Sequence, residues 1–494
     1  MLIKHLIIAV YFAVLFLIGI LASRRVKNIK DYYVGGKKLG YWVVAFSTRA
    51  TGESAWLLLG LTGLGAMVGY SAFWVAVGEV IGVMGAWLLM AKPFKRLSDQ
   101  YQSITIPDYL VSHFKARSNW LRIIASTALS IFVVIYVSAQ IDATGSAFEA
   151  FLGWNYFMGA LVGFAIVVVY IFFGGFVAVA WSDFFQGLLM FLGLVTLPLV
   201  ALLFLPGGES LHEGLRALDP ALVNIWGPGG FSGTNVAAII GYLLIGLGFL
   251  GSPQIFVRFM SIRDEAEIDR GRWVAIAFTL LTDIAAVSIG IIGRYLFTEA
   301  GADPEVVLGN NGQNVLIVLV EFTLPALLVG VYVAVVLAAI MSTIDSLLVV
   351  ASSAIIRDFY QQIFKKGEEI NNLTRLSRLV TLVMALAALG IALVVAITVP
   401  GRTIFWFAIF GWSGIAATFC PMMMLSLFWK GYTERGAIAS MVTGFLSVPF
   451  FKFVMPTVPV VGPYFELVAE MGPSFVLSLL AGYIFSILGS SDDE

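Results

Sequence analysis

Long runs of apolar residues, separated by short polar segments, follow one another along the whole chain. A helix that crosses the hydrocarbon core of a membrane needs about 20 such residues, and the runs reach that length. We therefore predict an all-α polytopic membrane protein with about 13 transmembrane helices. The predicted spans are 3–23, 40–66, 70–92, 119–147, 153–174, 180–205, 234–257, 272–297, 313–352, 376–398, 402–428, 434–454 and 465–489. The ninth run is long enough to include a separate interfacial helix before Pro325.

Basic residues gather in alternate loops of this arrangement. The basic loops are 24–38, 92–117, 258–272, 357–378 and 430–435. The intervening loops are poor in them, since 206–233 holds only Arg216 and 298–312 holds none. Cytoplasmic loops carry the excess of Lys and Arg. We therefore expect a multi-pass protein of the cell (inner) membrane with the N-terminus outside and the C-terminus in the cytoplasm.

Two of the predicted spans contain clustered helix-breaking residues. These are Gly52, Gly60, Gly63 and Gly65 in the second span, and Gly246, Gly248, Gly251 and Pro253 in the seventh. Each span opens a set of five, 40–205 and 234–428, and the two sets begin on opposite sides of the membrane. Inverted repeats with broken first helices are a transporter design that places the substrate at the breaks. The alternative is that these glycines only permit close helix packing.

The rest of the chain surrounds these two repeats. The remaining parts are a first helix with its cytoplasmic loop (1–39), an external loop (206–233), and two C-terminal helices with a short tail (429–494).

Composition narrows the classes of function. Of 494 residues, 60% are hydrophobic and 12% are charged, against about 25% charged in a soluble domain. The net charge of −1 gives no sign of nucleic-acid binding. One cysteine and three histidines leave no disulfide framework and no thiolate metal site. No loop is long enough for a soluble catalytic domain. An enzyme embedded in the membrane would need a nucleophile–base pair or a metal set, and the chain offers only one cysteine, with its three histidines at span edges or in loops. We therefore expect no enzyme, and we infer no obligatory protein partner.

Charged residues inside the apolar runs are the first candidates for function, because a charge at the bilayer centre costs about 2.5–3.5 kcal/mol. They are Arg49, Glu53, Glu79, Asp142, Asp183, Asp283, Arg294 and Asp345. Arg49 and Glu53 lie four residues apart and form an ion pair on one helix face in the simplest interpretation. Otherwise an unwound helix leaves Glu53 to bind a cation, or Arg49 meets a substrate carboxylate. We place Glu79, Asp142, Asp283 and Arg294 near span ends, where they reach towards water.

The second polar cluster is the stretch LAAIMSTIDSLLV, 337–349. Its small residues permit a close helix neighbour, and its hydroxyls with Asp345 offer hard oxygen ligands for an alkali cation. The alternative is a small-residue packing seam, which does not need a carboxylate. Asp183 is either a further ligand or the N-cap of the sixth span, and its position in the sequence favours the cap.

Several segments of the chain resemble the sodium/solute symporter family, and within it the bacterial sodium/proline symporters. The segments are DYYVGGKKLG (31–40), SAWLLLGLTG (54–63), SITIPDYL (103–110), FFGGFVAVAWSDFFQG (172–187), GLGFLGSPQIFVRFM (246–260) and LAAIMSTIDSLLVVASSAIIRDFY (337–360). The resemblance implies thirteen helices around a LeuT-like inverted five-helix core.

The resemblance also implies the residues of the transport site. One sodium ion is expected between the second and ninth spans, bound by the backbone carbonyls of Ala50, Glu53 and Ala339 and the hydroxyls of Ser342 and Thr343. A second sodium, present in some members, would use Asp183, Ser342, Asp345 and Ser346. The solute is expected at Ser54, Trp56, Tyr136, Gln140, Phe249 and Pro253.

The chain departs from the family pattern around the solute. Proline symporters of the family usually read Ala-Ser-Asp-Met-Ser-Gly-Trp where this chain reads Ala-Thr-Gly-Glu-Ser-Ala-Trp, 50–56. Gly52 thus replaces an aspartate, and Arg49 replaces a small residue. Ile245 stands for an aromatic residue and Phe249 for a tyrosine. These changes leave the expected sodium ligands in place and alter the wall of the solute pocket.

The resulting hypothesis is sodium-coupled import of a small organic solute, proline or a related amino acid, by alternating access. The alternatives are coupling to protons through Glu53 or Asp345, another solute such as a sugar or carboxylate, and a transporter-like sensor or channel.

Overall fold

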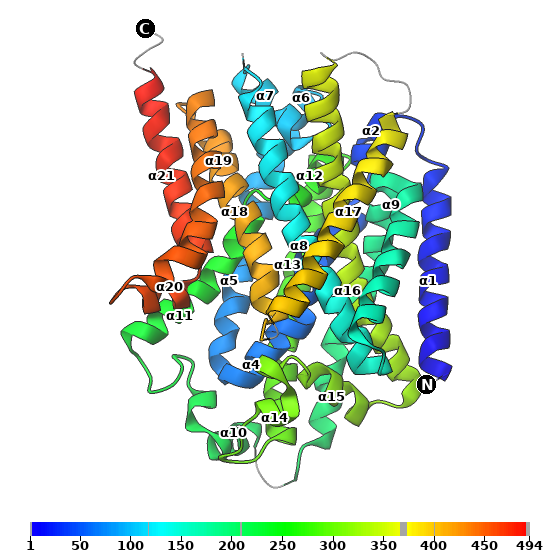
Figure 1. Cartoon of the computed structure of the whole chain (residues 1–494), viewed down its shortest axis with the longest axis vertical. Coiled ribbons are helices and arrows are strands. Elements are labelled where there is room, and N and C mark those ends of the chain that lie inside the picture. The colour runs from blue at the N-terminus through cyan, green and yellow to red at the C-terminus, as the bar shows by residue number, and fades with distance from the viewer. Residues whose placement is uncertain (1, 117, 208–209, 366–372, 400, 491–494) are drawn as a thin grey trace.

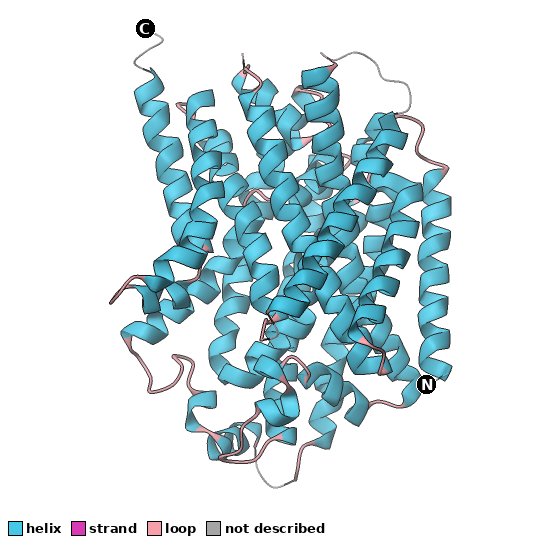
Figure 2. Ribbon diagram, viewed as in Figure 1, coloured by secondary structure: helices cyan, strands magenta, loops and turns pink. Residues whose placement is uncertain are grey.

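The backbone of a membrane span explains why the chain is helical. In hydrocarbon every N–H and C=O group must find a partner within the protein, which a helix provides by itself. The computed structural model describes residues 2–116, 118–207, 210–365, 373–399 and 401–490, and over these residues it contains helices and loops but no strands (Figure 2). This confirms the predicted all-α class. The C-terminal tail, 491–494, lies outside the described residues.

The α-helices have the following bounds: α1 Leu2–Ser23, α2 Ile29–Val34, α3 Tyr41–Ala55, α4 Thr62–Val68, α5 Phe73–Met84, α6 Ala91–Gln100, α7 Ile106–Phe114, α8 Trp120–Leu152, α9 Tyr156–Ala201, α10 Leu211–Leu218, α11 Gly233–Leu244, α12 Pro253–Ser261, α13 Glu265–Phe297, α14 Glu305–Leu308, α15 Val315–Thr323, α16 Ala326–Ser353, α17 Leu373–Thr398, α18 Ile404–Phe428, α19 Glu434–Pro449, α20 Gly462–Val468 and α21 Met471–Ser490.

Within the described residues, 11 helical segments are long and apolar enough to cross a membrane. One of them, Tyr41–Gln100, is 60 residues long, which at about 1.5 Å per residue is far longer than the bilayer is thick. The backbone turns inside it at Gly69, where φ is +62°, so this segment makes two passes. A shorter apolar helix covers Tyr156–Val169. The number of thirteen spans stays a prediction.

Two features anticipated from the sequence have structural counterparts. Leu324 and Pro325 separate α15 from α16, so the ninth apolar run is two helices. The fifth and sixth predicted spans together form α9, whose direction changes at Gly175, with φ +55° and ψ −158°. A Cβ at Gly175 would lie 2.5 Å from the ring of Tyr32, so only glycine fits there.

The helices form a bundle in which the start of α1 and the end of α21 lie at opposite ends (Figure 1). The N-terminal end of α1 lies in the lower part of the view, as do α10 and α14, and α21 ends in the upper part. The broken helix α3 lies inside the bundle, packed against α9, α13 and α16. Side chains along α16 are almost all buried from Val329 to Ser353. The polar cluster of the ninth span therefore faces protein.

Candidate functional site

The second span is interrupted where the glycine pattern predicts a break. Ser54 has φ +31° and ψ −165°, a conformation that a residue with a side chain rarely adopts. A wide helical turn, Trp56–Leu61, follows it before α4 continues. The break leaves the backbone oxygens around residues 50–53 available to groups other than their own helix, which is the usual way in which a transporter exposes carbonyl ligands.

The expected sodium ligands of α3 and α16 lie together. The Ser342 hydroxyl donates to the carbonyl oxygens of Ala50 (3.0 Å) and Ala339 (3.1 Å). The Thr343 hydroxyl lies 3.2 Å from the carbonyl oxygens of Ala339 and Thr51. All of these residues are buried. Two hydroxyls and three carbonyls thus form a closed group of hard oxygens that joins the broken span to α16, and this donor set fits an alkali cation.

Glu53 takes a different place from the other four expected ligands. Its carbonyl oxygen accepts the N–H of Trp56, and its carboxylate accepts from Arg49, with Nη2 to Oε1 at 2.8 Å. Arg49 Nη2 also donates to Glu79 Oε1 at 2.6 Å. The ion pair between Arg49 and Glu53 is therefore present, and a second carboxylate shares the guanidinium.

The positions predicted for Glu79 and Asp283 near span ends are wrong. Both side chains are 0% exposed, and together with Glu53 they bring one carboxylate oxygen each to within 4.8 Å of one another. Position along the sequence does not reveal the burial of Glu79, because its compensating charge comes from Arg49 on another helix. Asp142 is also paired, with the side chain of Arg402 at 2.5 Å.

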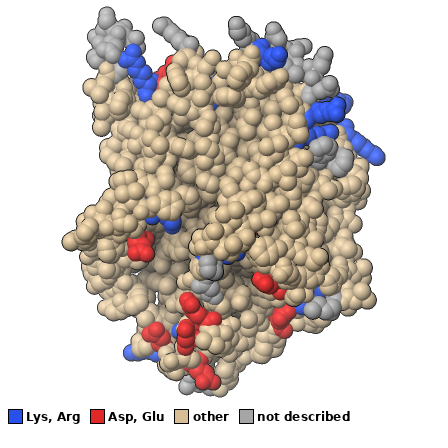
Figure 3. All heavy atoms as spheres, viewed as in Figure 1, with Lys and Arg blue, Asp and Glu red and all other residues tan. Residues whose placement is uncertain are grey.

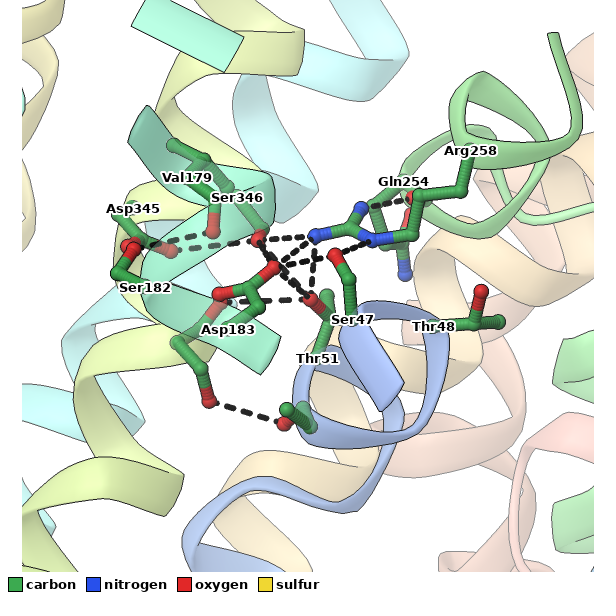
Figure 4. A network of polar contacts seen from close by, with 12 residues as sticks. Ser47, Thr48, Thr51, Val179, Ser182, Asp183, Gln254, Arg258, Asp345 and Ser346 are labelled. Atoms are coloured by element: carbon green, nitrogen blue, oxygen red, sulfur yellow. Dashed lines mark hydrogen bonds and ion pairs between the residues drawn. The ribbon is translucent and has the colours of Figure 1, made fainter. Parts of the chain in front are cut away.

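Asp183 is not a helix N-cap, because α9 has already run for seven residues beyond its break at Gly175. Its carboxylate is 0% exposed and faces a cluster of polar groups from three other helices (Figure 4). Oδ2 accepts from Ser47 at 2.7 Å, and hydroxyls of Thr51 and Ser346 lie 3.3 Å away. The cap interpretation of Asp183 is therefore wrong, and its role as a sodium ligand stays a prediction.

The positive group at the centre of this cluster is Arg258, which the sequence had placed in a cytoplasmic loop. Helix α12 continues to Ser261, so the side chain turns into the bundle and is 0% exposed. Its Nη2 lies 2.6 Å from Asp183 Oδ2 and 2.5 Å from Ser346 Oγ. Ser346 in turn donates to Asp345 Oδ1 at 3.2 Å. Two of the four residues expected to bind a second sodium, Asp183 and Ser346, thus contact a guanidinium.

Most of the residues expected around the solute also converge. The Ser54 hydroxyl lies 3.2 Å from the Tyr136 hydroxyl and accepts from Gln140 Nε2 at 3.3 Å. The Trp56 indole N–H donates to the carbonyl of Gly52 at 3.0 Å. The ring of Phe249 lies 4.7 Å from the guanidinium carbon of Arg49.

The seventh span is broken as the sequence predicts. Helix α11 ends at Leu244, a tight turn covers Ile245–Phe249, and α12 begins at Pro253. The Trp412 indole N–H donates to the carbonyl of Ile245 at 3.1 Å, and the Trp412 ring lies 5.1 Å from that of Phe249. Trp412 of α18 therefore holds the second break in place. The ring of Tyr136 also lies near Trp412, at 6.2 Å.

Several residues of these networks were not predicted from the sequence, among them Ser47, Thr51 and Arg258. Ser47 and Thr51 lie four residues apart, so both are on one face of α3, and this spacing indicates a polar stripe. Arg258 is flanked by apolar residues on both sides, in QIFVRFM. Apolar neighbours on both sides are not typical of a loop, and they were the signal in the sequence that Arg258 is buried.

Sequence comparison agrees with this arrangement. Residues 32–444 match the sodium:solute symporter family. The chain is 34% identical over 482 residues to the high-affinity proline transporter PutP of Bacillus subtilis (strain 168), covering 97% of this chain and 96% of that protein. It is 32% identical to a sodium/proline symporter of Staphylococcus aureus, covering 98% of this chain and 92% of that protein.

Solved structures show the same fold. A sodium-coupled sialic acid symporter in a substrate-bound outward-open state superposes with a TM-score of 0.80 at 19% identity, over 98% of this chain and 97% of that one. Mhp1, a nucleobase-cation-symport-1 family transporter in a closed conformation, gives a TM-score of 0.58 at 12% identity, over 94% and 95%. The broken helices, the oxygen groups between them and the match over most of the chain lead to one conclusion: the chain belongs to the sodium:solute symporter family.

Proposed function

We propose that the protein is a sodium-coupled secondary active symporter of the cell membrane that imports proline or a closely related amino acid. The observation that carries the proposal is the group of hard oxygens between the broken span and α16, contributed by Ala50, Thr51, Ala339, Ser342 and Thr343. Membership of the sodium:solute symporter family and the proline-transporting relatives support it.

Sodium would bind where the two hydroxyls now bridge carbonyls of α3 and α16. An ion there replaces the hydroxyl-to-carbonyl contacts of Ser342 and Thr343 by ion–oxygen contacts, and so joins the two helices more strongly. Because α3 also carries the break at Ser54, sodium binding orders the backbone that the solute meets. This is a direct physical link between the ion and the solute.

The solute would lie at the two helix breaks, among Ser54, Trp56, Tyr136, Gln140, Phe249 and Pro253. Ser54, Tyr136 and Gln140 supply hydroxyl and amide groups, and the aromatic rings supply apolar surface. A small amino acid with a short apolar side chain suits such a lining. Gly52 and Phe249 distinguish this pocket from the usual pattern of the family's proline symporters, because the ring of Phe249 occupies the space beside Gly52.

The orientation we propose places the N-terminus outside and the C-terminus in the cytoplasm. In the space-filling view, Lys and Arg gather at the end of the molecule where α21 ends, and Asp and Glu gather at the opposite end (Figure 3). The excess of Lys and Arg at one end is the signal that orients membrane proteins. Inward sodium movement would then be driven also by the membrane potential, about 2.3 kcal/mol per charge for each 100 mV.

The outer side contains a cavity that ends at the paired charges of Asp142 and Arg402. The cavity has a volume of about 400 Å³ and is lined also by Gln313, Asn314 and Glu149. Arg402 Nε lies 3.0 Å from Asp142 Oδ1, and the Tyr156 hydroxyl donates to the same oxygen at 2.5 Å. We propose that this ion pair closes the outer path and opens when the ion and solute enter.

The test is uptake of labelled proline into proteoliposomes that hold the purified protein, with an inward sodium gradient or with choline in place of sodium. Accumulation that needs sodium supports both the ion and the solute. Equal uptake in the two conditions, following a pH gradient, overturns sodium coupling and favours protons. No uptake in either overturns proline, and a panel of other amino acids, sugars and carboxylates then identifies the solute.

A further inference from the structure

Arg258 occupies the place where the resemblance to the family leads one to expect a second sodium ion. We propose that its guanidinium is a tethered cation that fills this place, so that the protein binds one sodium ion per transport cycle. The inference rests on the proposed sodium-coupled function and specifies its stoichiometry.

The contacts of Arg258 resemble the surroundings of a bound ion. One nitrogen, Nη2, meets three oxygens: Asp183 Oδ2 at 2.6 Å, Thr51 Oγ1 at 2.6 Å and Ser346 Oγ at 2.5 Å. An Nη2 group has only two hydrogens, so one more oxygen converges on it than it can serve with separate hydrogen bonds. Nε meets a fourth oxygen, Ser47 Oγ, at 2.7 Å (Figure 4).

These oxygens come from three different helices, which a free ion bound at this place would hold together. Ser47 and Thr51 belong to α3, Asp183 to α9 and Ser346 to α16. Arg258 reaches them from α12, which begins at the break in the seventh span. The guanidinium thus connects both broken helices to the two helices that carry the acidic and hydroxyl groups.

Charge explains why sodium and the guanidinium exclude each other. The Arg258 and Asp183 side chains are both 0% exposed and form an ion pair. A sodium ion that binds Asp183 would lie beside an unscreened positive charge in a medium of low dielectric constant, where like charges repel strongly. Removing the guanidinium would instead leave Asp183 as an unpaired buried carboxylate, which must attract another cation or lose its charge.

The tethered cation does not interfere with the first sodium. Thr51 belongs to both groups, but through different atoms: its carbonyl faces Thr343, and its side-chain oxygen faces Arg258. The Ser342 hydroxyl donates to Ala50 and Ala339 and makes no hydrogen bond to Arg258 among the described contacts. One site is therefore open to sodium, while the neighbouring one already contains a positive charge.

The test counts bound sodium directly on purified protein in detergent, by equilibrium binding of radioactive sodium, without transport. The variants are Arg258→Ser, Arg258→Lys, and Arg258→Ser combined with Asp183→Asn. We expect one sodium in the wild type, two in Arg258→Ser, and one again in Arg258→Lys and in the double variant. Arg258→Lys keeps a cation on the tether, and Asp183→Asn removes the charge that would hold the new ion.

The outcomes separate this inference from the proposed function. Two sodium ions in the wild type would overturn the tethered cation while supporting sodium coupling. One sodium in a folded Arg258→Ser protein would also overturn it, because the vacated carboxylate would then have gained no ion. No sodium in the wild type would overturn the proposed function and the inference together. If Arg258→Ser does not fold, the counts for the wild type and Arg258→Lys still decide between one ion and two.

Discussion

Thr343 provides a sharp test of the sodium site, because a single hydroxyl can be removed from a fully buried position. Its Oγ1 lies 3.2 Å from two carbonyl oxygens, those of Ala339 and Thr51, and the residue is 0% exposed. Replacement by alanine removes one ligand from this buried position. The serine variant keeps the hydroxyl and loses only a methyl group.

The magnitude follows from the energy of one contact to a charged group, about 1.5–3 kcal/mol. Since about 1.4 kcal/mol corresponds to a factor of ten in affinity, we expect Thr343→Ala to weaken sodium binding roughly 10- to 150-fold. Thr343→Ser should remain within about threefold of the wild type, a difference below 1 kcal/mol. A buried threonine of α17, Thr381, makes the same kind of bond to its own helix, to the carbonyl of Ser377 at 2.9 Å. Thr381→Ala should leave sodium affinity unchanged.

The assay measures the sodium concentration that gives half-maximal proline uptake, together with equilibrium sodium binding by the same variants. Both quantities should change by the same factor in Thr343→Ala. An unchanged sodium affinity in that variant would refute the site between α3 and α16. If Thr343→Ser were as impaired as Thr343→Ala, the side chain would be acting through its shape, and the hydroxyl would not be a ligand.

The remaining predictions concern other buried groups of the bundle. Arg49→Met leaves buried carboxylates without their cation and should lower the free energy of unfolding by about 3–5 kcal/mol; denaturant titration in micelles measures this, and Arg96→Met, at an exposed ion pair, should have no measurable effect. Gly52→Ala should abolish uptake, because its Cβ would lie 2.7 Å from the Phe249 ring; the added change Phe249→Ala should restore part of the activity, and no restoration would contradict the steric cause. Burial lowers the pKa of His113, so its contribution to stability is present above its unfolded value of about 6.5 and is lost as the pH falls. Stability measured from pH 7 to 5 should therefore decline less in His113→Gln than in the wild type, and equal declines would argue against this assignment.

The features that could be predicted from the sequence are those that depend on neighbouring residues. The length and spacing of apolar runs predicted an all-α membrane protein, because each span must satisfy its own backbone in lipid. Clustered glycines marked the breaks near Ser54 and before Pro253, because glycine tolerates a backbone that other residues resist. The oxygen-bearing stretch 337–349 and the segments shared with a known family indicated a sodium site, and α3 and α16 do bring most of its expected ligands together.

The pairing of buried charges could not be predicted from the sequence and is seen in the folded structure. Arg49 and Glu79 are 30 residues apart and Arg258 and Asp183 are 75 apart, and nothing in the local pattern of either segment indicates its partner. The sequence therefore placed Glu79 near a span end and Arg258 in a loop, since an isolated charge is costly in a membrane. That cost falls when another helix brings the opposite charge within hydrogen-bond distance. Pairing of this kind is fixed by how helices distant in sequence pack, and so it is visible only in the folded chain.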